Sequence, residues 1–423
     1  MPWRITSPII LQCRNISAMS KNSSTLEKVL HISACFIVEI DAGKITLDDA
    51  LDKCDPMIRR ITEHLLLSFY RNRKKILALL NKFCSKTPPP YTGALLSSAL
   101  TQIIFQNSVT PASVVNVAVS LGKKCHADRF INAVLRNILR GQEYLSIGTN
   151  KQASEVLPDT ILKHWSRDFS QEQIALFAEL FLLQPEFTFR LCNDTPLPEY
   201  AGSVKGYGSF RFATAEAKQV LESAEFASGK YYVQDPATSL SVAMVEDILP
   251  KLNNVLDLCA APGGKSLMIA EKLSPKANLT AADISEKRQK LTQQNFALRN
   301  LPHKVITAAP ENISGIFDLV FADLPCSNSG VFRRRADALW RFSEKSLRDI
   351  GAIQKKIISR AAELTAPGGF LLCSTCSIEK SENSAIIDAV LSKFPSFKLL
   401  KSETLLPSKE CDGAFAALLH NSL

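Results

Sequence analysis

The sequence predicts an α/β protein with a doubly wound, Rossmann-like sheet, preceded by an all-α domain and a small α+β intermediate region. Three observations support this. After residue 231, short apolar runs bounded by turn residues alternate with amphipathic segments, which is typical of a mostly parallel sheet covered by helices. Before residue 145, apolar residues recur at helical spacing. The length of 423 residues, with 46% hydrophobic and 22% charged residues, predicts two or three globular domains.

The sheet region should contain five strands, because five apolar runs have strand length and end in turn residues. Amphipathic segments between and after these runs predict four helices. The expected strands are 255–258, 279–283, 304–307, 317–322 and 369–373, and the expected helices are 264–273, 285–299, 344–364 and 380–393.

The region before the sheet divides into helical and mixed parts. In the last helix of the first part, Phe130 and the residues at helical spacing from it form an apolar face, and Arg129, Arg136 and Arg140 lie opposite. A helical stretch, one strand and a Gly-rich turn follow a polar linker. The predicted domains are an extension over 1–25, a helical domain over 26–145, an intermediate region over 156–230 and the sheet domain over 231–423.

Positive charge is concentrated in one segment. Residues 71–140 hold eleven Lys or Arg and a single acid, so this segment carries +10 and the rest of the chain about −1. An excess of this size favours a polyanionic partner such as RNA, although a solvated basic surface is an alternative.

Composition excludes several classes of protein. Apolar runs are too short for a membrane helix, so no membrane segment is expected. Eleven scattered cysteines indicate free thiols in a reducing compartment, and we expect a cytoplasmic monomer. We expect no metal, because the Cys373/Cys376 pair lacks a second pair or nearby histidines. The basic extension is expected to be flexible, with an organelle-targeting segment as the alternative.

A loop between the first sheet strand and its helix predicts a cofactor site. Glycines in such a loop let a ligand approach the backbone, and an acid that ends the second strand, Asp283, is suited to ribose hydroxyls. The Gly-x-Gly-x-x-Gly pattern of nicotinamide enzymes is absent, so S-adenosylmethionine fits better than NAD. The loop consists of Cys259, Ala260, Ala261, Pro262, Gly263, Gly264 and Lys265.

Two cysteines follow strands that should end at the same edge of the sheet. Cys326 follows the strand over 317–322, and Cys376 follows the strand over 369–373. Cys373 lies on a strand and is expected to be structural. Two thiols in polar turns beside a cofactor loop, with Asp323 at the same rim, predict a sulfur nucleophile and a second reactive thiol.

These motifs resemble those of the RNA 5-methylcytosine methyltransferases of the Sun (RsmB) and NOL/NSUN superfamily. The resemblance rests on the loop at 259–265, on Asp-Leu-Pro-Cys-Ser at 323–327 and on Ser-Thr-Cys-Ser at 374–377. It extends to Val-Gln-Asp-Pro-Ala at 233–237, to residues 379–384 and to Asp-Gly at 412–413. The helical region, with Phe-Ile-Asn-Ala-Val-Leu-Arg-Asn-Ile at 130–138, is similar to the NusB-like RNA-binding domain of the bacterial Sun branch.

The resemblance implies methyl transfer from S-adenosylmethionine to C5 of a cytosine, most often in small-subunit (16S) ribosomal RNA. It implies that Cys376 attacks C6, that Cys326 removes the C5 proton, and that Asp323 binds the base or the cofactor. It assigns the cofactor to residues 259–265, Asp283, Arg288 and Asp323. We also expect RNA contacts from Arg129, Arg136, Arg140, Arg333, Arg334 and Arg335.

The chain departs from the family pattern at two positions. The family usually has an acid after the third strand, where Thr-Ala-Ala-Pro at 307–310 offers none, and it commonly has Ala where Leu324 stands. The alternatives are a catalytically weak RNA-binding ribosome-assembly factor and a tRNA cytosine-C5 methyltransferase. A DNA cytosine methyltransferase is a third, but it would not need Cys376.

Overall fold

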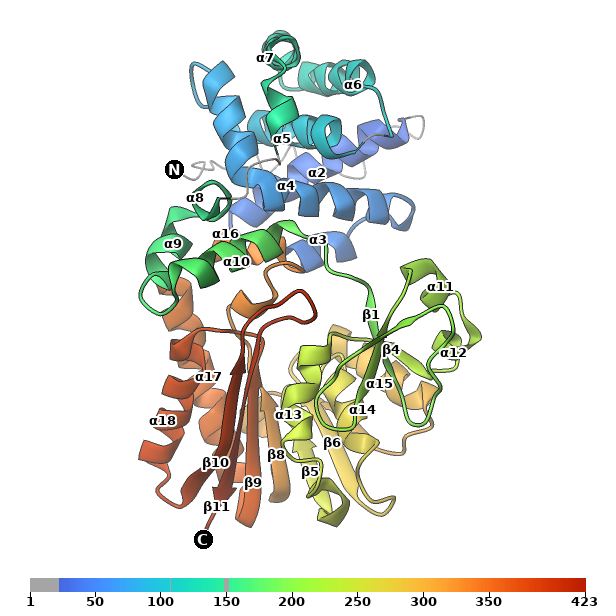
Figure 1. The fold of residues 1–423 in the computed structure, drawn as a ribbon, viewed down its shortest axis with the longest axis vertical. Coiled ribbons are helices and arrows are strands. Elements are labelled where there is room, and N and C mark those ends of the chain that lie inside the picture. Colours follow the sequence, from blue (N-terminus) through green and yellow to red (C-terminus); the bar gives the residue numbers. More distant parts are fainter. Residues whose placement is uncertain (1–22, 107, 148–151) are drawn as a thin grey trace. The chain divides into compact units, whose positions relative to one another are not determined.

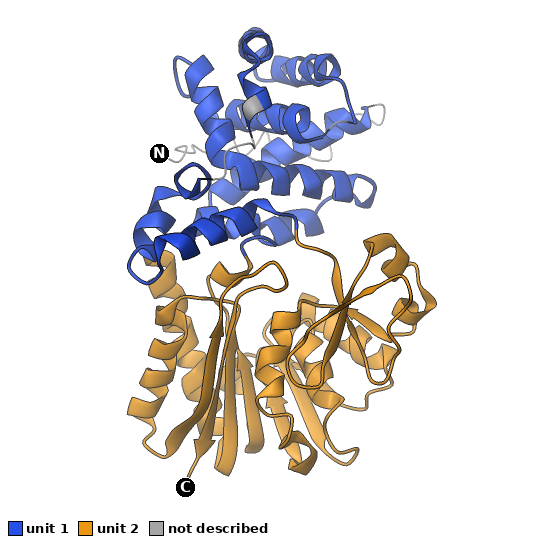
Figure 2. Ribbon diagram, viewed as in Figure 1, with its two compact units in different colours: residues 1–184, 332–343 blue, residues 185–331, 344–423 orange. Residues whose placement is uncertain are grey.

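The computed structural model describes residues 23–106, 108–147 and 152–423, in two compact units (Figures 1 and 2). Unit 1 comprises residues up to 184 together with 332–343, and unit 2 comprises 185–331 and 344–423. Residues 1–22 of the predicted extension lie outside the described residues.

Unit 1 is helical, as the sequence predicts. Its helices begin at recognisable caps: the Asp55 carboxylate accepts a hydrogen bond from Met57 N–H, and Ser170 and Gln173 form a capping box. The helices are α2 (Thr25–Asp41), α3 (Leu47–Asp52), α4 (Pro56–Phe83), α5 (Pro90–Phe105), α6 (Pro111–Lys123), α7 (Asp128–Gly141), α8 (Ala153–Val156), α9 (Asp159–Trp165), α10 (Gln171–Leu182) and α16 (Ala336–Arg341).

Helix α7 has the predicted amphipathic form, with one exception. Ile131, Val134, Leu135 and Ile138 are buried, but Phe130, predicted on the apolar face, is 37% exposed. Phe130 lies in the first turn of the helix, and its ring stands partly in solvent.

Residues 332–343 belong to unit 1 although both neighbouring segments of the chain belong to unit 2. Helix α4 holds this segment at two positions. Trp340 Nε1 donates to the carbonyl of Tyr70 (2.7 Å), and Arg71 Nη2 donates to the carbonyl of Arg333 (2.8 Å). The segment is therefore an integral part of the helical unit.

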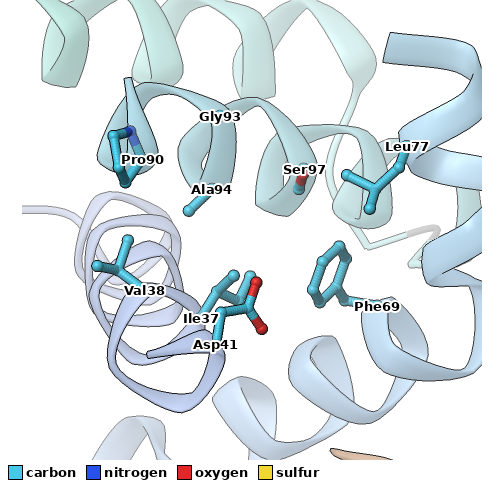
Figure 3. Close-up of a pocket in the computed structure, with 9 residues that line it drawn as sticks. All are labelled: Ile37, Val38, Asp41, Phe69, Leu77, Pro90, Gly93, Ala94 and Ser97. Carbon is cyan, nitrogen blue, oxygen red and sulfur yellow. The ribbon is translucent and has the colours of Figure 1, made fainter. Parts of the chain in front are cut away.

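Figure 3 shows a cavity in unit 1 lined mainly by apolar side chains of α2, α4 and α5, with the Asp41 carboxylate at its edge. Arg73 binds both carboxylate oxygens of Asp41, at 2.6 and 2.8 Å. The cavity has a volume of about 10 Å³, the space of one water, and is therefore too small for a ligand.

Unit 2 is built on a seven-stranded sheet in the order β10-β11-β9-β8-β5-β6-β7 (Figure 1). The five predicted strands are present and pair in parallel. The strands are β5 (Asn254–Asp257), β6 (Asn278–Asp283), β7 (Lys304–Thr307), β8 (Phe317–Asp323), β9 (Thr365–Thr375), β10 (Phe397–Leu405) and β11 (Ala414–Asn421).

Helices cover both faces of this sheet, so the predicted doubly wound class is confirmed. Alternate residues of β5 enter opposite cores: Val255 packs toward Leu267 and Phe296, and Leu256 packs toward Ile358 and Ile386. The helices of the first face are α13 (Ser239–Ala243), α14 (Gly264–Ala270) and α15 (Glu286–Leu298), and those of the second are α17 (Glu344–Leu364) and α18 (Ser384–Lys393).

Two features of unit 2 go beyond the predicted elements. The C-terminal strands β10 and β11 form a hairpin, and β11 lies antiparallel between β10 and β9, so the sheet is mixed. Residues 188–233 form a four-stranded antiparallel sheet in the order β2-β3-β1-β4, which includes part of the passage predicted as a turn. Its elements are β1 (Thr188–Leu191), β2 (Gly202–Val204), β3 (Arg211–Thr214), α11 (Ala217–Leu221), α12 (Ala224–Ala227) and β4 (Tyr231–Val233).

Candidate active site

The loops that carry the predicted site residues follow β5, β8 and β9, three adjacent parallel strands of unit 2. The chain runs from β5 outward to β7 and then crosses to β8 on the other side of β5. The carboxyl end of the sheet at such a reversal is where open α/β sheets bind ligands.

The loop at 259–265 requires glycine at two consecutive positions. Gly263 has a φ of +97°, which side-chain-bearing residues rarely adopt. A Cβ on Gly264 would lie 2.9 Å from Tyr232 Cε1 and 3.1 Å from Gln234 Nε2. The loop therefore runs tightly against β4 and starts α14 with its backbone N–H groups directed at the site.

Asp283 and Arg288 both hold this loop at Ala261. Asp283 ends β6, is 7% exposed and accepts hydrogen bonds from the N–H groups of Ala261 (3.1 Å) and Ser285 (2.8 Å). Arg288, on α15, donates to the carbonyl of Ala261. Each Asp283 oxygen keeps a second acceptor position, so the group can serve the loop and a ligand hydroxyl together.

Asp257, at the end of β5, is a site residue that the sequence analysis did not select. It is fully buried, and its Oδ2 accepts a hydrogen bond from Ser266 Oγ (2.5 Å). Among the described residues, its Oδ1 has no hydrogen-bond partner. Burial raises the pKa of this carboxyl to about 7. An unsatisfied buried oxygen beside a ligand loop is the kind of group that a bound ammonium or hydroxyl satisfies.

The two predicted thiols meet. Cys326 Sγ and Cys376 Sγ are 3.1 Å apart, and Cys376 Sγ also donates to Asn328 Oδ1 (3.2 Å). The pKa of Cys326 is raised well above its ordinary value, because of its hydrogen bond with Cys376, its burial, and the charges of Cys376 and Glu382.

The other cysteines near this edge have a different environment. Cys373 is 1% exposed and packs in the core of the sheet, as its strand position predicts. Burial also raises the pKa of Cys259 and of Cys373, which makes both poor nucleophiles. The pair formed by Cys326 and Cys376 is distinguished by the direct contact between its two sulfurs.

A partly buried ion pair lies between the cofactor loop and the thiols. Lys265 Nζ is 2.7 Å from Asp323 Oδ2, and Ser374 Oγ donates to Asp323 Oδ1 (2.6 Å). Burial opposes the charge of Lys265, but the Asp323 carboxylate outweighs it and the pKa of Lys265 is raised, with a further contribution from Cys376. Asp323, the last residue of β8, thus links the start of α14 to the end of β9.

A cavity of about 50 Å³ opens beside Cys376. Lys265 and Ser374 line it, together with Asp235 and Asp412. Asp235 Oδ1 accepts from the N–H groups of Ala237 (2.9 Å) and Asp412 (3.1 Å), which closes this side of the cavity. Asp235 and Asp412 belong to the sequence motifs at 233–237 and 412–413, but the motifs alone did not indicate that these residues line the same cavity.

The predicted RNA-binding arginines fall into two groups, both in unit 1. Arg129, Arg136 and Arg140 lie exposed on α7, where Arg136 donates to Asn132 Oδ1 and Arg140 to Asn137 Oδ1. In the segment at 333–335, Arg333 is only 7% exposed, Arg334 is partly exposed and Arg335 forms an ion pair with Asp48 (3.2 Å).

Residues 23–106, 108–147 and 152–423 contain no cluster of three or more His, Cys, Asp or Glu side chains arranged for a metal. Within the same ranges, no helix has the length and apolar character needed to cross a membrane.

Two protein families match this chain, one in its N-terminal helical part and one in its C-terminal sheet part. The family described as 16S rRNA methyltransferase RsmB/F matches residues 248–417, and the NusB family matches residues 31–140. The probable ribosomal RNA small subunit methyltransferase B of Bacillus subtilis is 27% identical over 378 residues, 83% of this chain and 84% of the relative. The ribosomal RNA small subunit methyltransferase B of Klebsiella pneumoniae is 28% identical, over 85% of this chain and 90% of the relative.

Other relatives match part of the chain or the fold alone. The ribosomal RNA small subunit methyltransferase F of Klebsiella pneumoniae is 33% identical over 185 residues, and the match spans 43% of this chain and 39% of that relative. The crystal structure of PH0851 superposes with a TM-score of 0.73 at 21% identity, over 95% of this chain and all of that chain. NSun6 from Pyrococcus horikoshii gives a TM-score of 0.51 at 16% identity, over 65% of this chain and all of that chain. These two structures support the fold.

The fold and the family match indicate a methyltransferase. More particularly, residues 248–417 match the 16S rRNA methyltransferase RsmB/F family, and residues 31–140 of the same chain match the NusB family. The resemblance drawn from the sequence motifs is confirmed.

Proposed function

We propose that this protein transfers a methyl group from S-adenosylmethionine to C5 of a cytosine in small-subunit ribosomal RNA, through a covalent bond between Cys376 and C6. The observation that carries the proposal is the separation of 3.1 Å between the Cys326 and Cys376 sulfurs at the ends of adjacent strands. Methylation at an unreactive C5 needs a nucleophile at C6 and a base for the C5 proton, and two adjacent thiols supply both.

The first step uses the unequal proton affinities of the two sulfurs. Two negative charges 3.1 Å apart repel each other strongly, so only one thiol of the pair ionises. Cys376 lines the cavity, and we propose that it is the thiol that ionises. Its sulfur bonds to C6, and the electron pair of the C5–C6 double bond moves into the ring. Lys265, held by Asp323 and lining the same cavity, is the cation that stabilises this ring charge.

The second step follows because bonding to C6 removes the charge from Cys376. The pKa of Cys326 then falls, and Cys326 loses its proton to solvent. After C5 has accepted the methyl group, the Cys326 thiolate takes the C5 proton. The C6–sulfur bond breaks, the double bond reforms, and Cys376 leaves as a thiolate. The reaction of Cys376 with C6 therefore allows Cys326 to ionise and to act as the base for the C5 proton.

The residues after β5 and β6 fit S-adenosylmethionine. When bound, this cofactor supplies an electrophilic methyl group on a sulfonium. Carboxylates suit its ammonium and hydroxyl groups, and Asp257 offers an unsatisfied oxygen and Asp283 a second acceptor position on each oxygen. We propose that residues 259–265 and Asp283 hold the cofactor, and that Arg288 supports the loop through Ala261.

We propose that the exposed face of α7 contacts the RNA backbone. Arg129, Arg136 and Arg140 are exposed there, and the partly exposed Phe130 offers a ring for base stacking. The burial of Arg333 makes that side chain a weaker candidate.

The test uses small-subunit ribosomal RNA labelled with tritium at C5 of cytosine. With S-adenosylmethionine present, the protein should release tritium into water in equal amount to the methyl groups incorporated, and digestion should yield 5-methylcytidine. Methyl incorporation without tritium release would mean that another atom is methylated. Activity on transfer RNA or duplex DNA, with none on ribosomal RNA, would reject the proposed substrate.

A further inference from the structure

The two loops that carry the thiols share one buried anchor, the carboxylate of Glu382. Glu382 ends the short 3₁₀ segment Lys380–Glu382, just before α18, and is 0% exposed. Its Oε1 accepts from Ser327 N–H (2.8 Å), and its Oε2 accepts from Ser327 Oγ (2.6 Å) and Ser377 Oγ (2.6 Å). Ser327 follows Cys326 and Ser377 follows Cys376, so one side chain binds the neighbour of each thiol.

The loop that contains Cys376 has a second attachment to the same segment. Asn383 Oδ1 accepts from Thr375 Oγ (2.6 Å), and Asn383 Nδ2 donates to the carbonyl of Ser377 (2.9 Å). Both neighbours of Cys376 are therefore held from the start of α18. The Cys376 carbonyl also accepts from Gly330 N–H (3.0 Å), which ties this loop to the one after Cys326.

A carboxylate is suited to this task and an amide is not. Both oxygens of a carboxylate accept hydrogen bonds, whereas the amide of glutamine has one acceptor oxygen and a donor nitrogen. At Glu382, both oxygens receive donors, and these donors come from two different loops. Burial raises the pKa of Glu382, and the bonds from Ser327 and Ser377 oppose that shift. The three hydrogen bonds therefore offset part of the cost of burying this carboxylate.

We propose that Glu382 is the positioning residue that sets the separation between Cys326 and Cys376. The register of β8 against β9 ends at Asp323 and Ser374, and past it the loops are joined directly by bonds such as the one from Gly330 N–H to the Cys376 carbonyl. The hydrogen bonds to Glu382 add an attachment at the residue that follows each thiol. This proposal rests on the proposed function, in which the two sulfurs act on opposite sides of one reaction, but its test does not depend on turnover.

The test compares Glu382→Gln with Asp388→Asn, an equivalent change at an exposed position of α18. Phenylarsine oxide condenses with two thiols to give two arsenic–sulfur bonds and water, and it does so readily only when the sulfurs are adjacent. Glu382→Gln should slow its capture of the Cys326–Cys376 pair about tenfold, the equivalent of one hydrogen bond to a charged group. Alkylation of Cys376 by iodoacetamide and the Kd for cofactor should change by no more than about twofold, as should every property of Asp388→Asn. Alkylation of Cys326 should be no slower than in the wild type, because loss of the Glu382 charge lowers the pKa of that thiol.

Methyl transfer by Glu382→Gln should fall in step with arsenical capture. Unchanged capture in Glu382→Gln would overturn the positioning role. If that variant fails to fold, Ser377→Ala removes one arm alone and should slow capture about threefold; capture at the wild-type rate would again overturn the proposal. If the wild type captures the arsenical but releases no tritium from C5-labelled RNA, the proposed function fails while the positioning role stands.

Discussion

The edge of the unit 2 sheet that carries Cys326 and Cys376, the thiol edge, differs from the exposed face of α7 in unit 1 in how deeply its functional groups are buried. At the thiol edge, the supporting groups are buried and accept hydrogen bonds from serines: Asp257 and Glu382 are both 0% exposed. On α7, the arginines are exposed, and Arg136 and Arg140 bond to asparagines of their own helix. Fixed, desolvated groups suit bond making, whereas exposed charges suit a partner recognised by its charge. Substitution of a reacting thiol in unit 2 should therefore abolish the chemistry, whereas substitutions on α7 should have graded, salt-dependent effects on binding.

The largest effect is expected at the nucleophile. Cys376→Ala should lower methyl transfer by about a thousandfold or more, as removal of a catalytic nucleophile commonly does. The Kd for S-adenosylmethionine should stay close to that of the wild type, because the loop at 259–265 is held by Asp283 and Arg288. Single-turnover transfer of a tritiated methyl group measures this, and appreciable remaining turnover would reject Cys376 as the nucleophile.

The triple variant Arg129→Ala, Arg136→Ala, Arg140→Ala should weaken RNA binding without changing the chemical step. Loss of three phosphate contacts should reduce the slope of log affinity against log salt by about 2. Binding titrations at several salt concentrations test this, and an unchanged slope would locate the RNA contact elsewhere. Point substitutions are preferable to truncation at residue 145, because residues 332–343 belong to the same helical unit.

A smaller effect is expected after β7, where the family's usual acid is missing. Ala309→Asp adds a carboxylate next to the end of β6, where Ala308 N–H donates to the Asp283 carbonyl. The change should tighten S-adenosylmethionine binding by about 1 kcal/mol, one hydrogen bond to the adenine amine. Calorimetry gives the Kd, and an unchanged value would mean that another group already binds the adenine.

A pH dependence of stability, separate from catalysis and binding, is expected to arise at Asp257. Its folded-state pKa of about 7 lies above the ordinary aspartate value of 3.8, so folding favours the protonated form. The stabilisation is complete below the unfolded-state pKa and is lost as the pH rises through about 7. Asp257→Asn cannot ionise, so its Tm relative to the wild type should increase between about pH 4 and pH 7. A constant difference in Tm over that range would contradict the assignment.

The sequence could predict those parts of the molecule where local chemistry determines the structure. Gly263 and Gly264 mark a loop that only glycine permits, and apolar runs identify the five parallel strands. The strand over 414–421 was not predicted, because its alanines and leucines favour a helix. Its pairing with β9 and β10 overrides that preference.

The supporting residues of the site were harder to predict for a related reason. A buried acid has the same letter as a solvated one, so Asp257 and Glu382 do not stand out in the sequence. Arg333 lies in a run of three arginines that suggests an exposed basic surface, yet its side chain is 7% exposed. Burial follows from contacts between residues far apart in the chain, and those contacts require the fold.

The most direct test of the central claim follows the covalent bond to RNA in Cys326→Ala and Cys376→Ala. If Cys376 attacks C6 and Cys326 removes the C5 proton, Cys326→Ala should form the bond, accept the methyl group and then stop. It should accumulate a protein–RNA adduct that runs as a slow band on a denaturing gel, and Cys376→Ala and the double variant should give none. An adduct from Cys376→Ala but not from Cys326→Ala would reverse the two roles, and no adduct from either would contradict covalent catalysis.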